Sequence, residues 1–355
     1  MDATGGVVFE HVSKRYGDVG AVEDVSFRVQ PGTLCTLLGP SGCGKTTTLR
    51  MVAGLEPVSS GRILIGGQDV TLRAANERNV SMVFQSYALF PHMSVLENVC
   101  YGPQSMRVDK AKSIDLARQK LGMLGLGGLE QRLPSELSGG QQQRVAVARS
   151  LVLEPAVLLF DEPLSNLDAK LRRRVRQDIR DLQQSLSLTV IYVTHDQEEA
   201  LAVSDHIIVM EGGRIAQEGS PQSLYERPAS RFLADFIGDA NLVDGEVVVS
   251  ADGERFAAGN VSLPVRANGV PPGPATLAIR PNRLRVSASA NGGALPGECR
   301  RAAYLGSRIE YVIETPWGEL LVFDDAAQRM HARGATLGIT FDPESAIVLP
   351  RAAAS

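Results

Sequence analysis

Residues 39–48, GPSGCGKTTT, decide the fold of this chain. They follow a continuous apolar run, TLCTLLG at 33–39, and they precede a segment with helical spacing, TTTLRMVAGL at 46–55. The pattern GxxxxGK[ST] between a buried strand and a helix is typical of a loop that binds phosphate, because its glycines let backbone N–H groups turn toward phosphate oxygens and the helix dipole favours an anion. The predicted phosphate-binding residues are Gly39, Pro40, Ser41, Gly42, Cys43, Gly44, Lys45, Thr46 and Thr47.

The last residues of this loop predict how a nucleotide is held. Lys45 is expected to reach the β and γ phosphates, and Thr46 is expected to place its hydroxyl on Mg²⁺.

Two acidic residues end a second apolar run, AVLLFDE at 156–162. A carboxylate in this position usually holds the Mg²⁺ of a bound nucleotide. Because side chains alternate along a strand, Asp161 and Glu162 are expected to have different roles. Asp161 is predicted to orient Mg²⁺ through water, and Glu162 to polarise the attacking water as a general base. A third apolar run, TVIYVTH at 189–195, completes the pattern of an α/β domain whose site lies at the carboxyl edge of a parallel sheet.

Composition limits the classes of protein that fit. The 355 residues are enough for two domains, and 36 Lys and Arg against 40 Asp and Glu give no general attraction to nucleic acid or to an anionic membrane. Four cysteines without metal-ligand spacing predict a reduced compartment. We expect no secretory signal and no membrane-spanning stretch, so another chain would have to anchor this one at a membrane.

A second glycine cluster, LSGGQQQR at 137–144, precedes another helical segment and offers a second helix N-terminus suited to an anion. With GPSGCGKTT before it and LLFDEP after it, the cluster resembles the ATP-binding subunit of an ABC transporter. The resemblance implies an α/β P-loop NTPase domain with a helical subdomain, and ATP and Mg²⁺ as cofactors. It also implies a head-to-tail homodimer, in which the ATP on the phosphate loop of one copy contacts the other copy's Ser138, Gly139, Gly140 and Gln141.

Four further residues match positions with known roles in that family. Tyr16 in SKRYGD matches the aromatic residue that stacks on adenine, and Gln85 in VFQSYALFPH matches the glutamine that senses Mg²⁺ and water while its loop contacts the membrane subunit. Asp168 in SNLDAK matches the loop that crosses the dimer seam, and His195 matches the histidine that reaches the γ-phosphate. The predicted catalytic residues are Glu162, His195, Gln85 and Lys45, and the predicted Mg²⁺ ligands are Thr46, Gln85 and Asp161.

The character of the sequence changes after about residue 236, where short β-type runs alternate with Gly, Pro and Asn. Residues 1–237 are predicted to form the ABC-type ATP-binding domain, and residues 238–355 a small all-β domain similar to the oligonucleotide/oligosaccharide-binding-like (TOBE-type) barrel of importer ATPases. Nucleic acid is not an expected partner, because residues 236–355 contain 11 Arg, no Lys and 13 acids. Dimer contact or regulation is the expected use of this domain.

The resemblance implies an ATPase that powers import through separate integral-membrane permease subunits fed by a periplasmic solute-binding protein. The chain is then expected to lie peripherally at the cytoplasmic face of the bacterial inner membrane. Ferric iron is the first expectation for the solute. The segments that resemble ferric-iron importers most are ENVCYG, HDQEEALAVSDHIIVM and RPASRFLADFIGDANL. Polyamine (spermidine or putrescine) or 2-aminoethylphosphonate import is the alternative, and sulfate and sugar import rank below these. More remote alternatives are a non-transport ABC ATPase and a ligand-sensing module in which ATP turnover is secondary.

Overall fold

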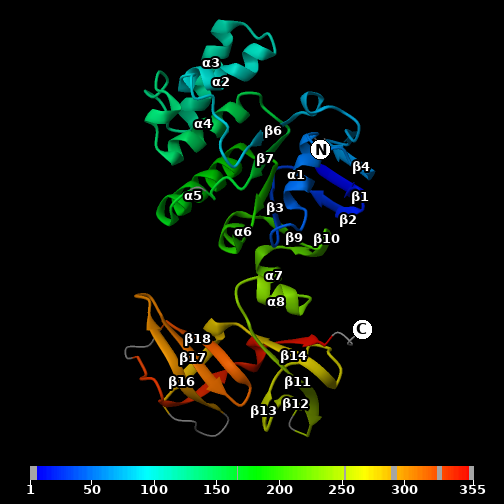
Figure 1. Ribbon diagram of the computed structural model, residues 1–355, viewed down its shortest axis with the longest axis vertical. Helices are drawn as coiled ribbons and strands as arrows, with labels where there is room; N and C mark the ends of the chain where they lie inside the picture. Colours follow the sequence, from blue (N-terminus) through cyan, green and yellow to red (C-terminus); the bar gives the residue numbers. More distant parts are fainter. Residues whose placement is uncertain (1–5, 166, 252, 289–293, 326–329, 352–355) are drawn as a thin grey trace. The chain divides into compact units, whose positions relative to one another are not determined.

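The three apolar runs lie side by side as buried parallel strands in the computed structural model shown in Figure 1. The structure describes residues 6–165, 167–251, 253–288, 294–325 and 330–351. Every residue of β3 (Leu34–Leu38), β7 (Val157–Asp161) and β8 (Val190–Thr194) is buried, so these strands have no polar face. They belong to a sheet of six described strands in the order β10-β9-β3-β8-β7-β6, which also contains β6 (Val80–Val83), β9 (His206–Glu211) and, antiparallel to β9, β10 (Arg214–Gly219).

A second sheet packs with α1 (Lys45–Ala53) against one face of the first. Its four described strands run in the order β2-β1-β4-β5 and are antiparallel: β1 (Val7–Tyr16), β2 (Val19–Val29), β4 (Ser60–Ile65) and β5 (Gln68–Asp69). Apolar side chains from both sheets and from α1 share one core, which fixes the phosphate-binding loop between them.

Helices cover the other face of the six-stranded sheet. The long helix α5 (Ala169–Leu186) packs Val175 and Ile179 into a core with Leu158, Phe160 and Tyr192 of the sheet. The predicted helical subdomain has its own core of apolar side chains. It comprises α2 (Val95–Ser105), α3 (Lys110–Met123) and α4 (Gly139–Leu151). Outside this subdomain, α6 (Gln197–Val203) follows β8.

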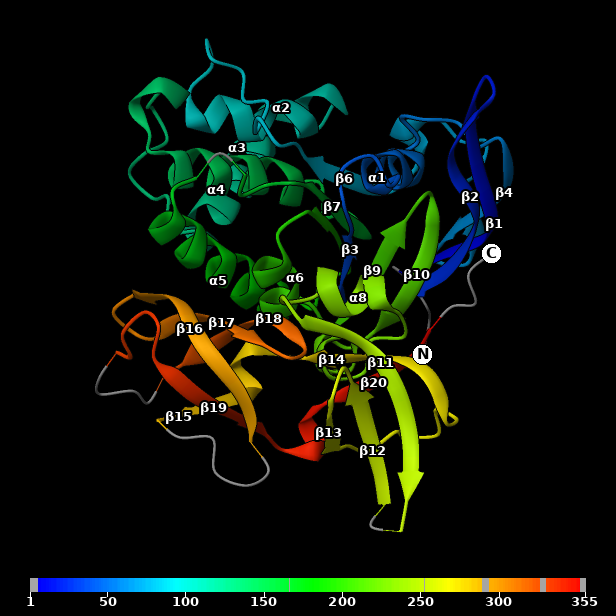
Figure 2. The ribbon, with the colours of Figure 1, turned by 60° about the horizontal axis from the view of Figure 1, so that its bottom comes forward.

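The chain divides into two units, Met1–Pro221 and Gln222–Ser355. The second unit starts within α7 (Pro221–Glu226). It continues through α8 (Arg231–Phe236) into the strands that Figure 2 shows. The predicted domain boundary after residue 237 follows α8 directly and stays a prediction.

The all-β fold predicted for residues 238–355 is confirmed, and the ten described strands of this region form two antiparallel sheets of five that share one core. One sheet has the order β13-β12-β11-β14-β20, with strands Val261–Pro264, Gly253–Ala258, Asn241–Ser250, Gly273–Ile279 and Ile347–Pro350. The other has the order β15-β19-β16-β17-β18, with strands Leu284–Ser287, Thr336–Phe341, Leu295–Tyr304, Ile309–Thr315 and Gly318–Asp324.

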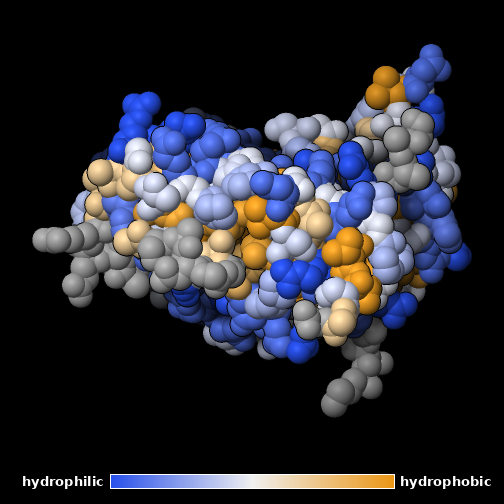
Figure 3. Space-filling view, turned by 90° about the horizontal axis from the view of Figure 1, so that it is seen from below, coloured by the Kyte–Doolittle hydropathy of each residue, from blue (hydrophilic) through white to orange (hydrophobic). Residues whose placement is uncertain are grey.

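The surface seen in Figure 3 shows apolar residues in small groups among hydrophilic ones. Scattered apolar side chains of this kind are ordinary on a solvent-facing surface. In the part of the chain that the structure describes, no helix is both long enough and apolar enough to span a membrane.

Candidate nucleotide-binding site

The predicted phosphate-binding loop joins β3 to α1, and its shape requires glycine at the residue that precedes the helix. Gly44 has φ 101°, and a Cβ placed there would lie 2.6 Å from the backbone oxygen of Ala21. Because Gly44 has no side chain, it leaves the first N–H groups of α1 without a side-chain cap. The N-terminus of α1 is therefore open to an anion from outside the helix.

Lys45 lies inside this loop, with only 6% of its surface exposed. Its ammonium group donates hydrogen bonds to the backbone oxygens of Gly39, at 2.7 Å, and Pro40, at 2.9 Å. Cys43 is also buried, and its Sγ lies 3.7 Å from the same ammonium group. The lysine charge is thus already directed into the loop, where the β and γ phosphates are expected.

Asp161 at the end of β7 and Thr46 in α1 are in contact. Burial raises the pKa of Asp161, while the charge of Arg50 and a hydrogen bond from Thr46 act in the opposite direction. A hydroxyl, a carboxylate and the nearby Gln85 amide are the hard oxygen donors that suit Mg²⁺. The described residues contain no cluster of three or more His, Cys, Asp or Glu side chains that could hold a metal.

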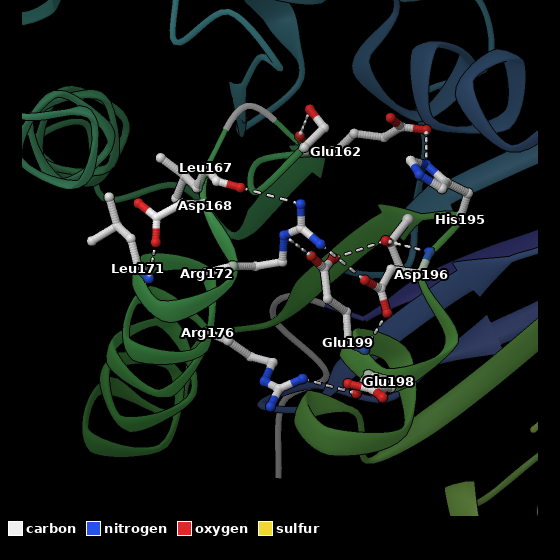
Figure 4. A network of polar contacts seen from close by, with 12 residues as sticks. Glu162, Leu167, Asp168, Leu171, Arg172, Arg176, His195, Asp196, Glu198 and Glu199 are labelled. Atoms are coloured by element: carbon white, nitrogen blue, oxygen red, sulfur yellow. Dashed lines mark hydrogen bonds and ion pairs between the residues drawn. The ribbon is translucent and has the colours of Figure 1, made fainter. Parts of the chain in front are cut away.

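Glu162 lies between two of the other predicted catalytic residues. Its Oε1 is 3.1 Å from Nδ1 of His195, and its Oε2 is 3.5 Å from Nε2 of Gln85. Figure 4 shows the contact between Glu162 and His195. The backbone of Glu162 has φ 44°, in the left-handed region that is costly for a residue other than glycine. Glu162 directly follows the last residue of β7, and its carboxylate faces His195.

Two residues that the sequence analysis did not identify hold the Gln85 segment. Ser165 accepts a hydrogen bond from Nε2 of Gln85 at 3.1 Å and donates one to the backbone oxygen of Glu162 at 3.0 Å. Arg149 of α4 donates to the backbone oxygens of Tyr87, at 2.9 Å, and Ala88, at 2.7 Å. Ser165 stands three residues after Glu162, but a serine in a loop gives no signal of its own in the sequence.

Ser138, Gly139, Gly140 and Gln141 form the start of α4 and lie beside the loop that contains Asp168. Ser138 and Gln141 form a capping box: the Ser138 N–H donates to Oε1 of Gln141 at 2.9 Å, and the Gln141 N–H donates to Oγ of Ser138 at 3.4 Å. A Cβ at Gly139 would lie 3.0 Å from the side chain of Leu167, the residue before Asp168. Asp168 itself caps α5, since its carboxylate accepts from the N–H groups of Lys170 and Leu171.

The contacts therefore divide the predicted site into two groups. Gln85, Glu162 and His195 lie together, with Thr46 and Asp161 in contact beside them. The residues of the second glycine cluster and Asp168 form a separate group around the start of α4 and α5.

Tyr16 ends β1, and half of its surface is exposed. The Nζ of Lys14 lies 4.8 Å from its ring centroid. An exposed aromatic face is available at this position, and its predicted role with adenine stays a prediction.

A polar network lies behind His195. Glu199 of α6 is buried and accepts hydrogen bonds from the hydroxyls of Thr194, at 2.8 Å, and Tyr192, at 3.2 Å. Burial raises the pKa of Glu199 above its usual range, and it raises the pKa of Tyr192 as well. Arg172 of α5 faces this network, and the sequence analysis identified neither Glu199 nor Arg172.

Two family models match the chain. The ABC transporter model matches residues 22–165, and the TOBE domain model matches residues 277–349.

Relatives match over nearly the whole length. The chain is 58% identical over 339 residues to the Fe(3+) ions import ATP-binding protein FbpC of Agrobacterium fabrum, covering 95% of each chain. It is 46% identical over 352 residues to the protein of the same name from Escherichia coli O157:H7, covering 98% of each. Among solved structures it is similar to cbiO1 from Clostridium perfringens, part of the ABC transporter complex cbiONQ, with a TM-score of 0.59 and 28% identity over 64% of this chain and 92% of that one.

Proposed function

This chain belongs to the family of ABC transporter ATP-binding proteins, and we propose that its ATP hydrolysis drives the import of ferric iron. Similarity over almost the full chain to proteins named for Fe(3+) import supports the choice of solute. A subunit of this kind hydrolyses ATP and does not carry the solute itself, so the support comes from the whole chain and not from an iron site. Polyamine and 2-aminoethylphosphonate import are the alternatives that an uptake experiment distinguishes.

The position of Glu162 between His195 and Gln85 is the observation that carries the proposed chemistry. A carboxylate whose two oxygens face different partners is held in one orientation, as a general base must be to accept a proton from water. His195 fixes Glu162 from one side and, as an exposed side chain, is available to a γ-phosphate. Gln85 fixes it from the other side.

The phosphate groups would be bound by the loop from Gly39 to Thr47, with Lys45 supplying the positive charge. Thr46, Gln85 and Asp161 would hold Mg²⁺, which when bound neutralises charge on the phosphates.

We further infer that two copies of the chain act together. The start of α4 is separate from the phosphate-binding loop, so Ser138 and the neighbouring glycines are free to face the nucleotide of a second copy across a seam that includes Asp168. The C-terminal domain, predicted to span residues 238–355, would serve dimer contact or regulation.

A groove of about 500 Å³ beside the Gln85 segment supports docking of a permease subunit. Apolar side chains line it, among them Leu55, Met82, Phe84, Phe90, Tyr101 and Leu153. Leu55 and Tyr101 are about half exposed, although burial of such side chains is favourable. An apolar helix from a membrane subunit would fill this groove and hold the chain at the cytoplasmic face of the inner membrane. A periplasmic binding protein would deliver the solute to the opposite face of the permease.

The groove is tested with Leu55→Asp and with Leu72→Asp as the matched control, since Leu72 is 97% exposed and does not line the groove. Leu55→Asp should lose co-purification with the permease and leave the basal ATPase rate of the isolated chain unchanged. Leu72→Asp should retain both. Equal co-purification by the two variants would contradict the docking site.

The function is tested by uptake of labelled Fe³⁺ and spermidine into cells that lack this chain and are supplied with it again. Wild-type chain should restore Fe³⁺ uptake only, while Glu162→Gln should bind ATP but fall at least ~100-fold in turnover and restore nothing. Glu198→Gln, which alters an exposed carboxylate three residues after His195, is the control and should behave as wild type. Restored spermidine uptake without Fe³⁺ uptake would replace the proposed solute, and normal turnover of Glu162→Gln would reject Glu162 as the base.

A further inference from the structure

Arg172, in the first turn of α5, connects two loops that are far apart in the sequence. Its Nη2 donates to the backbone oxygen of Leu167 at 3.2 Å, and its Nη1 lies 3.5 Å from Oδ2 of Asp196. Its Nε faces Oε1 of Glu199 at 3.9 Å. Figure 4 shows the guanidinium group lying between the α5 loop on one side and the α6 loop on the other. The three nitrogens of one planar guanidinium group can face three acceptors in different directions in this way, whereas a lysine has a single nitrogen.

Of the two acidic partners of Arg172, Glu199 is buried more deeply than Arg172 itself. The Glu199 side chain is 5% exposed and the Arg172 side chain 35%. Oε2 of Glu199 is occupied by the hydroxyls of Thr194 and Tyr192, whereas Oε1 faces the arginine. A buried carboxylate with a cation on one side and hydroxyl donors on the other is held in place. Moving Arg172 away would leave the Glu199 carboxylate without its counter-charge in a poorly solvated place.

The distance between Nε of Arg172 and Oε1 of Glu199, 3.9 Å, is too long for a hydrogen bond. Among the described residues, no hydrogen-bond acceptor pairs with the buried Nε of Arg172. A cavity of about 50 Å³ is lined by Glu162, Ser165, Arg172, Thr194, His195, Asp196 and Glu199. The side chains around it therefore have room for a small shift that would bring Nε within hydrogen-bond distance of Glu199.

The two loops that Arg172 connects lead to different groups of the site. Leu167 precedes Asp168, which is expected at the seam between two copies. Asp196 follows His195, whose Nδ1 contacts Glu162. Asp196 is also tied to its own loop, since its N–H donates to Oγ1 of Thr194 at 3.0 Å and its Oδ1 accepts from the Glu199 N–H at 3.0 Å. These contacts form a continuous connection from the Asp168 loop through Arg172 to the backbone that carries His195.

We propose that Arg172 is a positioning residue, with Glu199 as its buried counter-charge. Through Arg172, the position of His195 relative to Glu162 depends on the conformation of the Asp168 loop. The proposal rests on the ATP hydrolysis proposed above. It requires Arg172 to affect the rate of the chemical step and not the binding of ATP, because the phosphate-binding loop contacts none of these side chains in the described structure.

Arg176 supplies a matched control on the same helix. It lies one turn further along α5, is half-buried, and donates to the backbone oxygen of Glu198 at 3.2 Å. Arg176 thus also joins α5 to α6, but its hydrogen bond among the described residues is to Glu198 and not to Leu167 or Asp196. Substitution at Arg176 removes a similar charge and a similar helix-to-helix contact without removing the proposed connection.

The experiment compares Arg172→Gln, Arg172→Lys and Arg176→Gln in the full-length protein, with kcat and KM for ATP measured per folded molecule. Arg172→Gln should lower kcat about 10- to 100-fold, as expected for a displaced catalytic group, and leave KM within about threefold. Arg172→Lys keeps the charge opposite Glu199, but it should still lower kcat at least about fivefold because its single nitrogen cannot face Leu167, Asp196 and Glu199 together. Arg176→Gln should keep wild-type kcat.

Three results would overturn the proposal: wild-type kcat in Arg172→Gln, wild-type kcat in Arg172→Lys, or an equal loss in Arg176→Gln. A role in stability alone would lower the melting temperature and leave kcat per folded molecule unchanged, which is the first of these results. Wild-type protein and Glu162→Gln are measured in parallel. Absence of hydrolysis in the wild type would reject the proposed function, whereas hydrolysis in the wild type with normal Arg172 variants would reject only the role of Arg172.

Discussion

The N-termini of α1 and α4 both begin among glycines and both are expected to face phosphate, but they are built in opposite ways. At α1, Gly44 adopts a left-handed conformation and supplies no side chain, so the first N–H groups of the helix await an external acceptor. At α4, Ser138 and Gln141 already satisfy each other. The N-terminus of α1 is thus open to a ligand as it stands. At the N-terminus of α4, a ligand would have to replace a hydrogen bond between Ser138 and Gln141.

A third helix shows what an ordinary cap looks like in this chain. Ser94 and Glu97 form the same capping box at the start of α2, where no nucleotide is expected. The cap of α4 is therefore a general device for helix stability that the proposed function also uses. The difference between α1 and α4 can be tested by separating effects on stability from effects on nucleotide binding.

The largest effect is expected for Gly44→Ala compared with Gly139→Ala. Alanine at Gly44 combines a left-handed backbone with a contact to the Ala21 oxygen, so the free energy of unfolding should fall by about 3 kcal/mol. Gly139 has no positive φ, and its added methyl group would meet only the end of the Leu167 side chain, so the change should stay within about 1 kcal/mol. Urea denaturation measures both, and equal losses would contradict the comparison.

The next effect is expected for Lys45→Ala. Loss of a charge-assisted contact to phosphate should weaken ATP affinity about 10- to 100-fold, measured by titration calorimetry. Lys120→Ala is the control, because Lys120 forms an ion pair with Glu154 on the helical subdomain, away from the phosphate-binding loop. ATP affinity in Lys45→Ala equal to that of the control would mean that the open end of α1 alone holds the phosphates.

A smaller effect is expected for Ser138→Ala, with Ser94→Ala as its matched control. Each substitution removes the serine of a capping box, so each should cost about 1 kcal/mol of unfolding free energy. Only Ser138→Ala should also weaken ATP-dependent dimerisation, which is followed by size-exclusion chromatography with Glu162→Gln present to prevent turnover. If both serine variants dimerise as well as the parent, Ser138 caps α4 but does not contact the nucleotide of the second copy.

The smallest change in stability is expected for Gln141→Glu. Glu97 fills the equivalent position in α2, where its Oε2 accepts from the Ser94 N–H at 2.7 Å, so a glutamate at 141 should keep the cap and alter stability by no more than about 0.5 kcal/mol. The added negative charge would face the phosphate of the second copy, and ATP-dependent dimerisation should fall. Undiminished dimerisation would show that the nucleotide does not approach this end of α4.

The parts of the site that lie within continuous motifs could be predicted from the sequence. The loop around Lys45 and the acids after β7 each combine a buried strand with chemistry at its end, and both were located correctly at the carboxyl edge of the sheet. The roles of these residues stay predictions until tested.

The supporting residues could not be predicted, because they gain their contacts only from the tertiary fold. Arg172 belongs to the run LRRRVRQ, in which each arginine resembles a solvated helix residue. Glu199 stands in the acidic start of α6 and is indistinguishable in the sequence from the exposed Glu198. Likewise, the short strands after residue 240 predict an all-β unit but not its division into two sheets, since pairing depends on partners far apart in the chain.

The length of α4 has a mechanical consequence. Its thirteen residues span about 20 Å, with Ser138 at one end and, near the other, Arg149 bonded to the backbone of Tyr87 and Ala88 beside the apolar groove. A helix shortens or bends far less easily than a loop, so in the proposed dimer α4 would connect the nucleotide of the second copy rigidly to the surface proposed for the permease. A movement of Ser138 on nucleotide binding would then reach the backbone of Tyr87 and Ala88 as a tilt of the whole helix.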